Sequence, residues 1–139
     1  MSSSETFIDN YRLWVEDDVL CLRASGPMTS AIVDWLVVTV PDLLSRHAHY
    51  YILADLIDAG AISPELRRRI VEFTAAHPPR AIAFFHVGLI AKGVNALLLG
   101  ALNLFSKRKQ LWLQCNTEGE ARAWLNEQRP GRHHSAAHS

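Results

Sequence analysis

Apolar and polar residues alternate along this chain in blocks whose lengths distinguish strands from helices. Residues 50–54 form a continuous apolar run, Tyr-Tyr-Ile-Leu-Ala, which is typical of a strand covered on both faces within a parallel sheet. An acidic, glycine-containing turn follows, and then a helix for which Ser63 is a good N-cap and Pro64 suits the first helical position. Further strand–helix units lie around this one, so the pattern predicts an α/β fold.

The remaining blocks predict the element order β-β-α-β-α-β-α-β-α, with a mixed sheet packed by helices. The expected elements are strands 7–15 and 19–24, helix 30–46, strand 50–56, helix 64–76, strand 80–87, helix 89–106, strand 111–115 and helix 118–128. Pro41 lies inside the first helix and predicts a kink or a break into two short helices. Thr117 and Glu120 predict a capping box for the last helix. We expect one domain over residues 7–128 and a disordered, histidine-rich tail over residues 129–139.

Composition narrows the class of protein. A chain of 139 residues with 49% apolar and 20% charged residues is most simply one globular domain. Its formal net charge of zero argues against broad electrostatic binding to nucleic acid. Cys21 and Cys115 each fall inside a predicted strand, so we expect reduced core thiols in the cytoplasm and no disulfide framework. The first residues lack the basic and apolar regions of a secretory signal.

Residues 81–105 are strongly apolar, so the stretch could be either a membrane span or a buried part of a globular domain. Lys92, Asn95 and Asn103 interrupt this stretch, whereas a span needs about 20 consecutive apolar residues. The pattern therefore predicts a strand followed by an unusually apolar helix, and no transmembrane segment.

The expected helix 89–106 is apolar around nearly its whole circumference, which indicates burial beyond one contact with a sheet. Three settings fit such a helix: the wall of a cavity, a dimer seam or a partner surface. Ordinary packing with a few exposed leucines fits equally well. The residues expected at an apolar interface or pocket are Leu89, Gly93, Leu97, Leu99, Gly100 and Leu102.

A second group of candidates is polar. In parallel α/β sheets, ligands gather outside the carboxyl ends of the strands. Asp55, Asp58, Ser63 and His86 fall in segments predicted at that edge, and we take them as candidates for interaction or switching. Turn chemistry and helix capping explain the same residues without any function.

Catalytic chemistry finds little support in the sequence. His86 could act as an acid or base, but no serine or cysteine nucleophile is expected at the same edge, so no catalytic residue is assigned and we predict a protein that is not an enzyme. The chain has no glycine-rich phosphate loop, and the tail histidines lack supporting groups. We therefore predict no cofactor and no metal site.

Several short motifs, in their order and spacing, resemble those of a known family. They are Arg12-Leu13-Trp14-Val15 paired with a strand to Leu22, Gly26-Pro27, Leu53-Ala54-Asp55-Leu56, and the helix 118–125 with its Ala-x-x-Trp-Leu ending. The sequence resembles the STAS domain, named for sulfate transporters and anti-sigma-factor antagonists, and more narrowly the SpoIIAA-like (STAS/CRAL-TRIO-like) group of small bacterial proteins. The resemblance covers about residues 7–128 and implies a single STAS-like domain.

The resemblance also carries an expectation about function. Members that act as anti-sigma antagonists have a phosphorylatable Ser or Thr in an Asp-Ser-Ser-Gly-like turn at the start of the second helix. Residues 62–66 stand at that position as Ile-Ser-Pro-Glu-Leu, without the paired serines and the glycine, and Ser63 lies about one position early. We expect a non-enzymatic regulatory module that binds a protein partner or a second copy in a homodimer and lacks the phosphorylatable serine switch. The alternative is a carrier or sensor of a lipid or other apolar ligand held beside helix 89–106.

Overall fold

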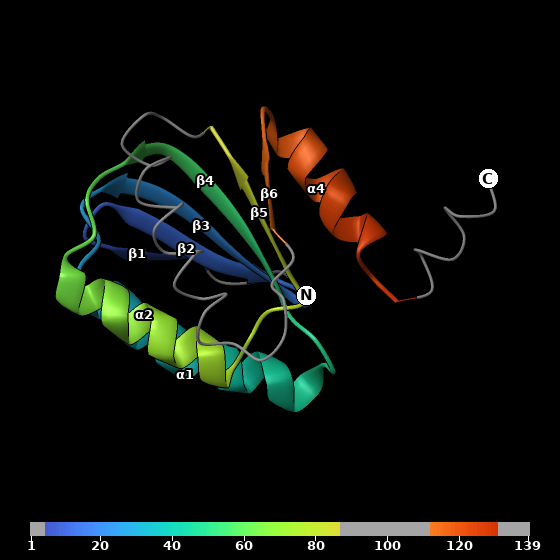
Figure 1. Cartoon of the computed structure of the whole chain (residues 1–139), viewed down its shortest axis with the longest axis horizontal. Helices are drawn as coiled ribbons and strands as arrows, with labels where there is room; N and C mark the ends of the chain where they lie inside the picture. Colours follow the sequence, from blue (N-terminus) through green and yellow to red (C-terminus); the bar gives the residue numbers. More distant parts are fainter. Residues whose placement is uncertain (1–4, 87–111, 131–139) are drawn as a thin grey trace.

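The computed structural model describes residues 5–86 and 112–130, which form a six-stranded sheet with the strands in sequence order (Figure 1). Its strands are β1 (Thr6–Ile8), β2 (Tyr11–Glu16), β3 (Val19–Gly26), β4 (Tyr51–Ala59), β5 (Ala81–Phe85) and β6 (Trp112–Cys115). Strands β1 to β3 pair antiparallel, and β3 to β6 pair parallel. The predicted α/β class with a mixed sheet is confirmed.

Helices cover the two faces of this sheet differently. Helices α1 (Ser30–Arg46) and α2 (Pro64–Ala76) lie side by side on one face, and α4 (Glu118–Glu127) lies on the other (Figure 1). No helix in the described part of the chain has the length and apolar character that a membrane span requires. The expected helix 89–106 and residues 131–139 of the expected tail lie outside the described residues.

The N-terminal strand differs from the prediction. The apolar pattern predicts one strand over residues 7–15, whereas the structure has two strands joined by a tight turn at Asp9 and Asn10. Asp9 has a φ of 54°, a left-handed conformation that Asp and Asn adopt more readily than most residues. The Thr29 hydroxyl donates to the Asp9 carboxylate at 2.6 Å, which attaches this turn to the start of α1.

Helix α1 continues through Pro41, so a break into two helices is wrong. Pro41 is exposed, and the carbonyl that loses its helical donor belongs to Val37, itself 39% exposed. Solvent can therefore bind that carbonyl. On the opposite side Val40 and Leu43 are buried, and their packing holds the helix together across the proline.

Strand β4 occupies the middle of the sheet and is buried on both faces, as predicted. Tyr51 and Leu53 pack toward α4, whereas Ala54 and Leu56 pack toward α1 and α2. The two predicted helix starts are also confirmed. Leu66 donates its backbone N–H to the Ser63 hydroxyl at 3.2 Å, and Thr117 forms the capping box of α4.

The ends of β3 and β4 approach each other closely. A Cβ atom at Gly60 would lie 2.7 Å from the carbonyl carbon of Gly26, so this position has space only for glycine. The backbone N–H of Gly60 donates to the carbonyl of Gly26 at 2.9 Å. This contact ties together the segments that follow the two strands at the carboxyl edge of the sheet.

Candidate binding site

Helix α4 covers only part of its face of the sheet. It packs over β4, β5 and β6 with Ala121 and Leu125 buried. The β1–β3 part of that face carries side chains of mixed character, among them Phe7, Trp14 and Arg23. An open groove of about 1310 Å³ lies between these strands and α4. Its lining includes the charged residues Glu5, Arg12, Glu16, Asp17, Arg23, Asp55, Glu118, Arg122 and Arg129.

Three charged or titratable residues meet on this face of the sheet, toward the carboxyl ends of β3, β4 and β5. Arg23 pairs directly with Asp55 in the β3–β4 register, and its Nε lies 3.6 Å from Asp55 Oδ2. The Nδ1 atom of His86, just beyond β5, lies 3.0 Å from Asp55 Oδ1. The backbone N–H of Ile57 also donates to Oδ1 at 3.1 Å. Asp55 is thus the common partner of the other groups.

The geometry of His86 determines which ring nitrogen faces outward. Its φ of 57° is left-handed, and its ring contacts the Phe85 ring edge-on with centroids 4.8 Å apart. Nδ1 faces a carboxylate, which can only accept, so Nδ1 carries a proton. Nε2 remains for other partners, and the His86 side chain is 41% exposed.

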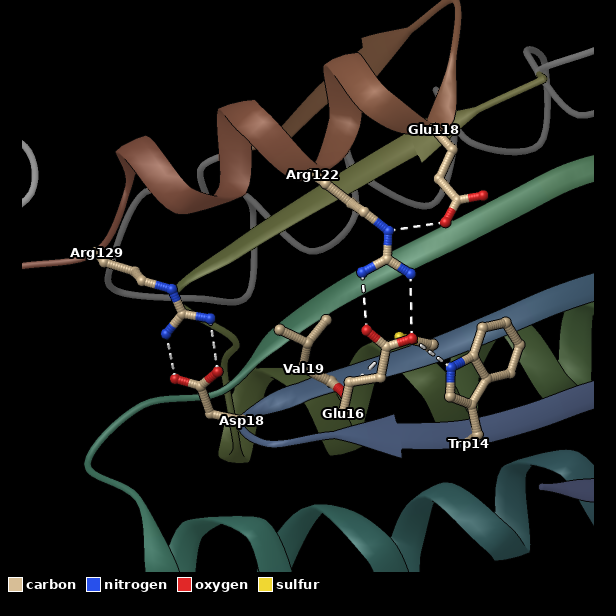
Figure 2. Close-up of polar contacts among 8 residues, drawn as sticks. Trp14, Glu16, Asp18, Val19, Glu118, Arg122 and Arg129 are labelled. Carbon is tan, nitrogen blue, oxygen red and sulfur yellow. Dashed lines mark hydrogen bonds and ion pairs between the residues drawn. The ribbon is translucent and has the colours of Figure 1, made fainter. Parts of the chain in front are cut away.

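At the other end of the groove, Arg122 attaches α4 to the β2–β3 hairpin (Figure 2). Arg122 binds Glu16 with two hydrogen bonds, at 2.8 and 3.1 Å, and donates from Nε to Glu118 at 2.7 Å. Trp14 donates its indole N–H to the same Glu16 carboxylate at 2.7 Å. Hydrogen bonds from Arg122 and then Trp14 lower the pKa of Glu16 below its ordinary value.

A second arginine–carboxylate pair attaches the residues after α4 to the same β2–β3 hairpin. Arg129 forms a bidentate ion pair with Asp18 (Figure 2). Its Nη2 atom lies 2.7 Å from Asp18 Oδ1. Its guanidinium also stacks on the Tyr51 ring at 4.7 Å from the centroid. Arg129 was the first residue of the expected tail, and here it binds the folded sheet.

Comparison of this structure with solved structures finds an uncharacterised protein of the DUF3478 family from Shewanella loihica, described as having a SpoIIAA-like fold. The two match with a TM-score of 0.54, covering 89% of this chain and 92% of that one. This protein has a SpoIIAA-like fold. The identity of 13% limits the likeness to the fold. No protein-family model and no curated protein matches the sequence.

The SpoIIAA-like fold brings together only some of the candidates predicted from the sequence. Asp55 and His86 are in contact. Asp58 is exposed and pairs with Ser25 in the β3–β4 register, and Ser63 is an exposed N-cap. Arg23 was missed, although it is a charged residue within an otherwise apolar strand and that was a usable signal. The candidates Leu89, Gly93, Leu97, Leu99, Gly100 and Leu102 lie outside the described residues.

The two cysteines of this SpoIIAA-like domain are free thiols. Cys21 is fully buried, and burial raises its pKa to about 12, so the thiol stays protonated at neutral pH and is a poor nucleophile. Burial also raises the pKa of Cys115. Within residues 5–86 and 112–130, His, Cys, Asp and Glu form no cluster of three that could hold a metal ion.

Proposed function

We propose that this protein is a non-enzymatic regulatory module of the cytoplasm, and that it binds a segment of a partner protein in the groove beside α4. The observation that carries the proposal is the exposed aromatic and arginine surface of β1 and β2. Phe7 is 69% exposed, and it pairs with Arg12, whose guanidinium stacks 4.5 Å from the centroid of Trp14. Aromatic residues and arginine are enriched in the central parts of protein interfaces.

The hydrogen bonding of Arg12 supports a polar contact from the partner. One of its terminal nitrogens binds Glu5, but its Nε is buried and has no acceptor within the described part of the chain. A buried donor without an acceptor is costly, so a shift of the Arg12 side chain that brings Nε to a carbonyl or carboxylate of a docked segment would be favourable. The segment that fits this surface has an apolar side chain for Phe7 and Trp14 and a polypeptide oxygen for Arg12.

The geometry argues against control through Ser63. In this fold Ser63 caps α2, and its hydroxyl accepts the Leu66 N–H. A phosphate there would lie beside Glu65 at the exposed N-terminus of α2, on the face of the sheet opposite to α4 and the proposed docking groove (Figure 1). We therefore propose that docking itself, without phosphorylation of Ser63, is the regulatory event.

An apolar ligand is a weaker second candidate. Its predicted binding helix, residues 89–106, lies outside the described residues. Half of the residues that line the groove beside α4 are charged, and this mixed lining suits a polypeptide better than a lipid chain. The expected homodimer stays a prediction, and the same experiment tests it.

Site-specific photocrosslinking in living cells tests the proposal. A photoreactive phenylalanine analogue replaces Phe7, and a matched control carries it at Val38, which is 73% exposed on α1. We expect a discrete adduct with another protein from position 7 and none from position 38. Equal adducts from both positions, or none from position 7, would contradict the proposal. An adduct of twice the chain mass would replace the partner by a second copy, and a lipid adduct would favour the carrier alternative.

A further inference from the structure

We infer that Arg23, Asp55 and His86 form a receptor for a phosphate monoester at the carboxyl edge of the sheet. The inference does not require a protein segment in the groove, because the three residues hold one another in place. Arg23 and Asp55 lie on the neighbouring parallel strands β3 and β4, and His86 directly follows the next strand, β5, toward the edge where α/β sheets usually bind ligands.

Asp55 is the shared partner that positions the other two residues of this site. Its side chain is only 13% exposed, and it faces Arg23, His86 and the Ile57 backbone N–H. The charge of Arg23 offsets its negative charge, and the His86 and Ile57 N–H groups hydrogen-bond its Oδ1 atom. An incoming anion therefore meets the outer atoms of Arg23 and His86, and not the carboxylate.

Arg23 supplies the first half of the recognition. Its side chain is 52% exposed, and Nε is the atom that lies nearest Asp55. The two terminal nitrogens of its guanidinium can therefore donate to a ligand in the forked geometry that suits an oxyanion.

His86 supplies the second half and selects the kind of oxyanion. Because Nδ1 donates to Asp55, Nε2 faces the ligand either as an acceptor or, when the ring is charged, as a donor. A phosphate monoester loses its second proton near pH 6, so at neutral pH it readily shares one proton with an imidazole. Either the phosphate hydroxyl donates to Nε2, or the imidazolium donates to the dianion. Sulfate carries no such proton, and it can use only the charged ring.

The test is an NMR titration of the full chain with inorganic phosphate, followed on the side-chain nitrogens of histidine and arginine. We expect His86 to show the Nδ1-protonated tautomer, and phosphate to give saturable shifts at His86 and Arg23. Sulfate at equal ionic strength should bind about tenfold more weakly, because it lacks the shared proton. Shifts that do not saturate, or sulfate binding as tight as phosphate, would overturn the inference.

Variants separate this site from general attraction between charges. His86→Gln and Arg23→Gln should each weaken phosphate binding about tenfold or more, and Arg23→Lys should weaken it because the fork is lost. The control Arg46→Gln removes an exposed arginine at the end of α1 and should leave the affinity unchanged. Circular dichroism confirms that each variant is folded. Affinity in Arg23→Gln or His86→Gln equal to that of the wild type would overturn the assignment.

Two phosphate sources distinguish this inference from the proposed docking groove. Glycerol phosphate represents a small ester, and a phosphoserine peptide with flanking apolar residues represents a docked segment. Binding of both with equal affinity supports the phosphate site and counts against a contribution from the groove. Tighter binding of the peptide, lost in Phe7→Ser, supports both. Failure of both ligands overturns the phosphate site and leaves the crosslinking test of the groove unaffected.

Discussion

The two faces of the sheet are stabilised in different ways. The face under α1 and α2 is continuous apolar packing, in which Leu13, Leu20 and Leu43 are fully buried. On the other face α4 contributes Ala121 and Leu125 to a smaller buried cluster of the sheet. Arginine–carboxylate pairs attach α4 and the residues after it to the β2–β3 hairpin. Buried apolar area contributes far more than partly exposed ion pairs. The first face therefore contributes more of the stability of the fold, while among the described residues the second face has an open groove between α4 and β1–β3.

The largest expected effect that tests this comparison is at Leu43. Leu43→Ala removes a fully buried side chain from α1, where the surrounding helices and sheet cannot collapse into the space. We expect a loss of about 3–5 kcal/mol in the free energy of unfolding, measured by urea denaturation. The control Val38→Ala changes an exposed residue of the same helix and should stay within about 0.5 kcal/mol of the wild type. A small effect at Leu43 would contradict the view that apolar packing under α1 and α2 is the main source of stability.

A smaller effect is expected at Leu125, the main apolar anchor of α4. Leu125→Ala should cost about 2 kcal/mol, because the space it leaves borders the open groove and water can enter it. Hydrogen exchange should rise in α4 and leave α1 and α2 protected. Equal acceleration in all three helices would show that the two faces unfold as one unit, contrary to the comparison.

Local signals in the sequence were sufficient for the described helices and the central strand. Ser63 with Pro64, and Thr117 with Glu120, bond within one helical turn, so their neighbours alone determine them. The two-residue turn at Asp9 was missed because polar residues inside a strand pattern also occur on an exposed edge. Its left-handed backbone becomes evident only in three dimensions.

In the candidate site too, some residues could be predicted from the order of elements along the chain, and others only from contacts between distant segments. Asp55 and His86 were placed together because the carboxyl-edge rule depends only on the order of strands and helices. Arg23 required the β3–β4 register, which sequence periodicity does not give. Arg122 and Glu16 are separated by 106 residues and meet only because α4 crosses back over the sheet. Contacts of this kind follow from tertiary packing, and no local pattern encodes them.

The smallest expected effect concerns the pair of Glu16 and Arg122. Their side chains are 42% and 39% exposed, so solvent screens the pair, and Glu16→Gln should cost only about 0.5–1 kcal/mol at neutral pH. The pKa of Glu16 is lowered in the folded state, chiefly by the Arg122 hydrogen bond, so the unfolded chain binds this proton more readily. The contribution is therefore complete above the ordinary value of 4.5 and is lost as pH falls through the lowered folded value.

Urea denaturation at several pH values checks this expectation. The difference between Glu16→Gln and the wild type should shrink as pH falls below about 4.5, and also as salt is raised to about 1 M. The control Glu72→Gln, on α2, changes a carboxylate that has no ion-pair partner among the residues described, and its effect should not depend on salt. A cost at Glu16 larger than that at Leu125 would mean that charge pairing, and not apolar burial, is the main force that holds α4 on its face.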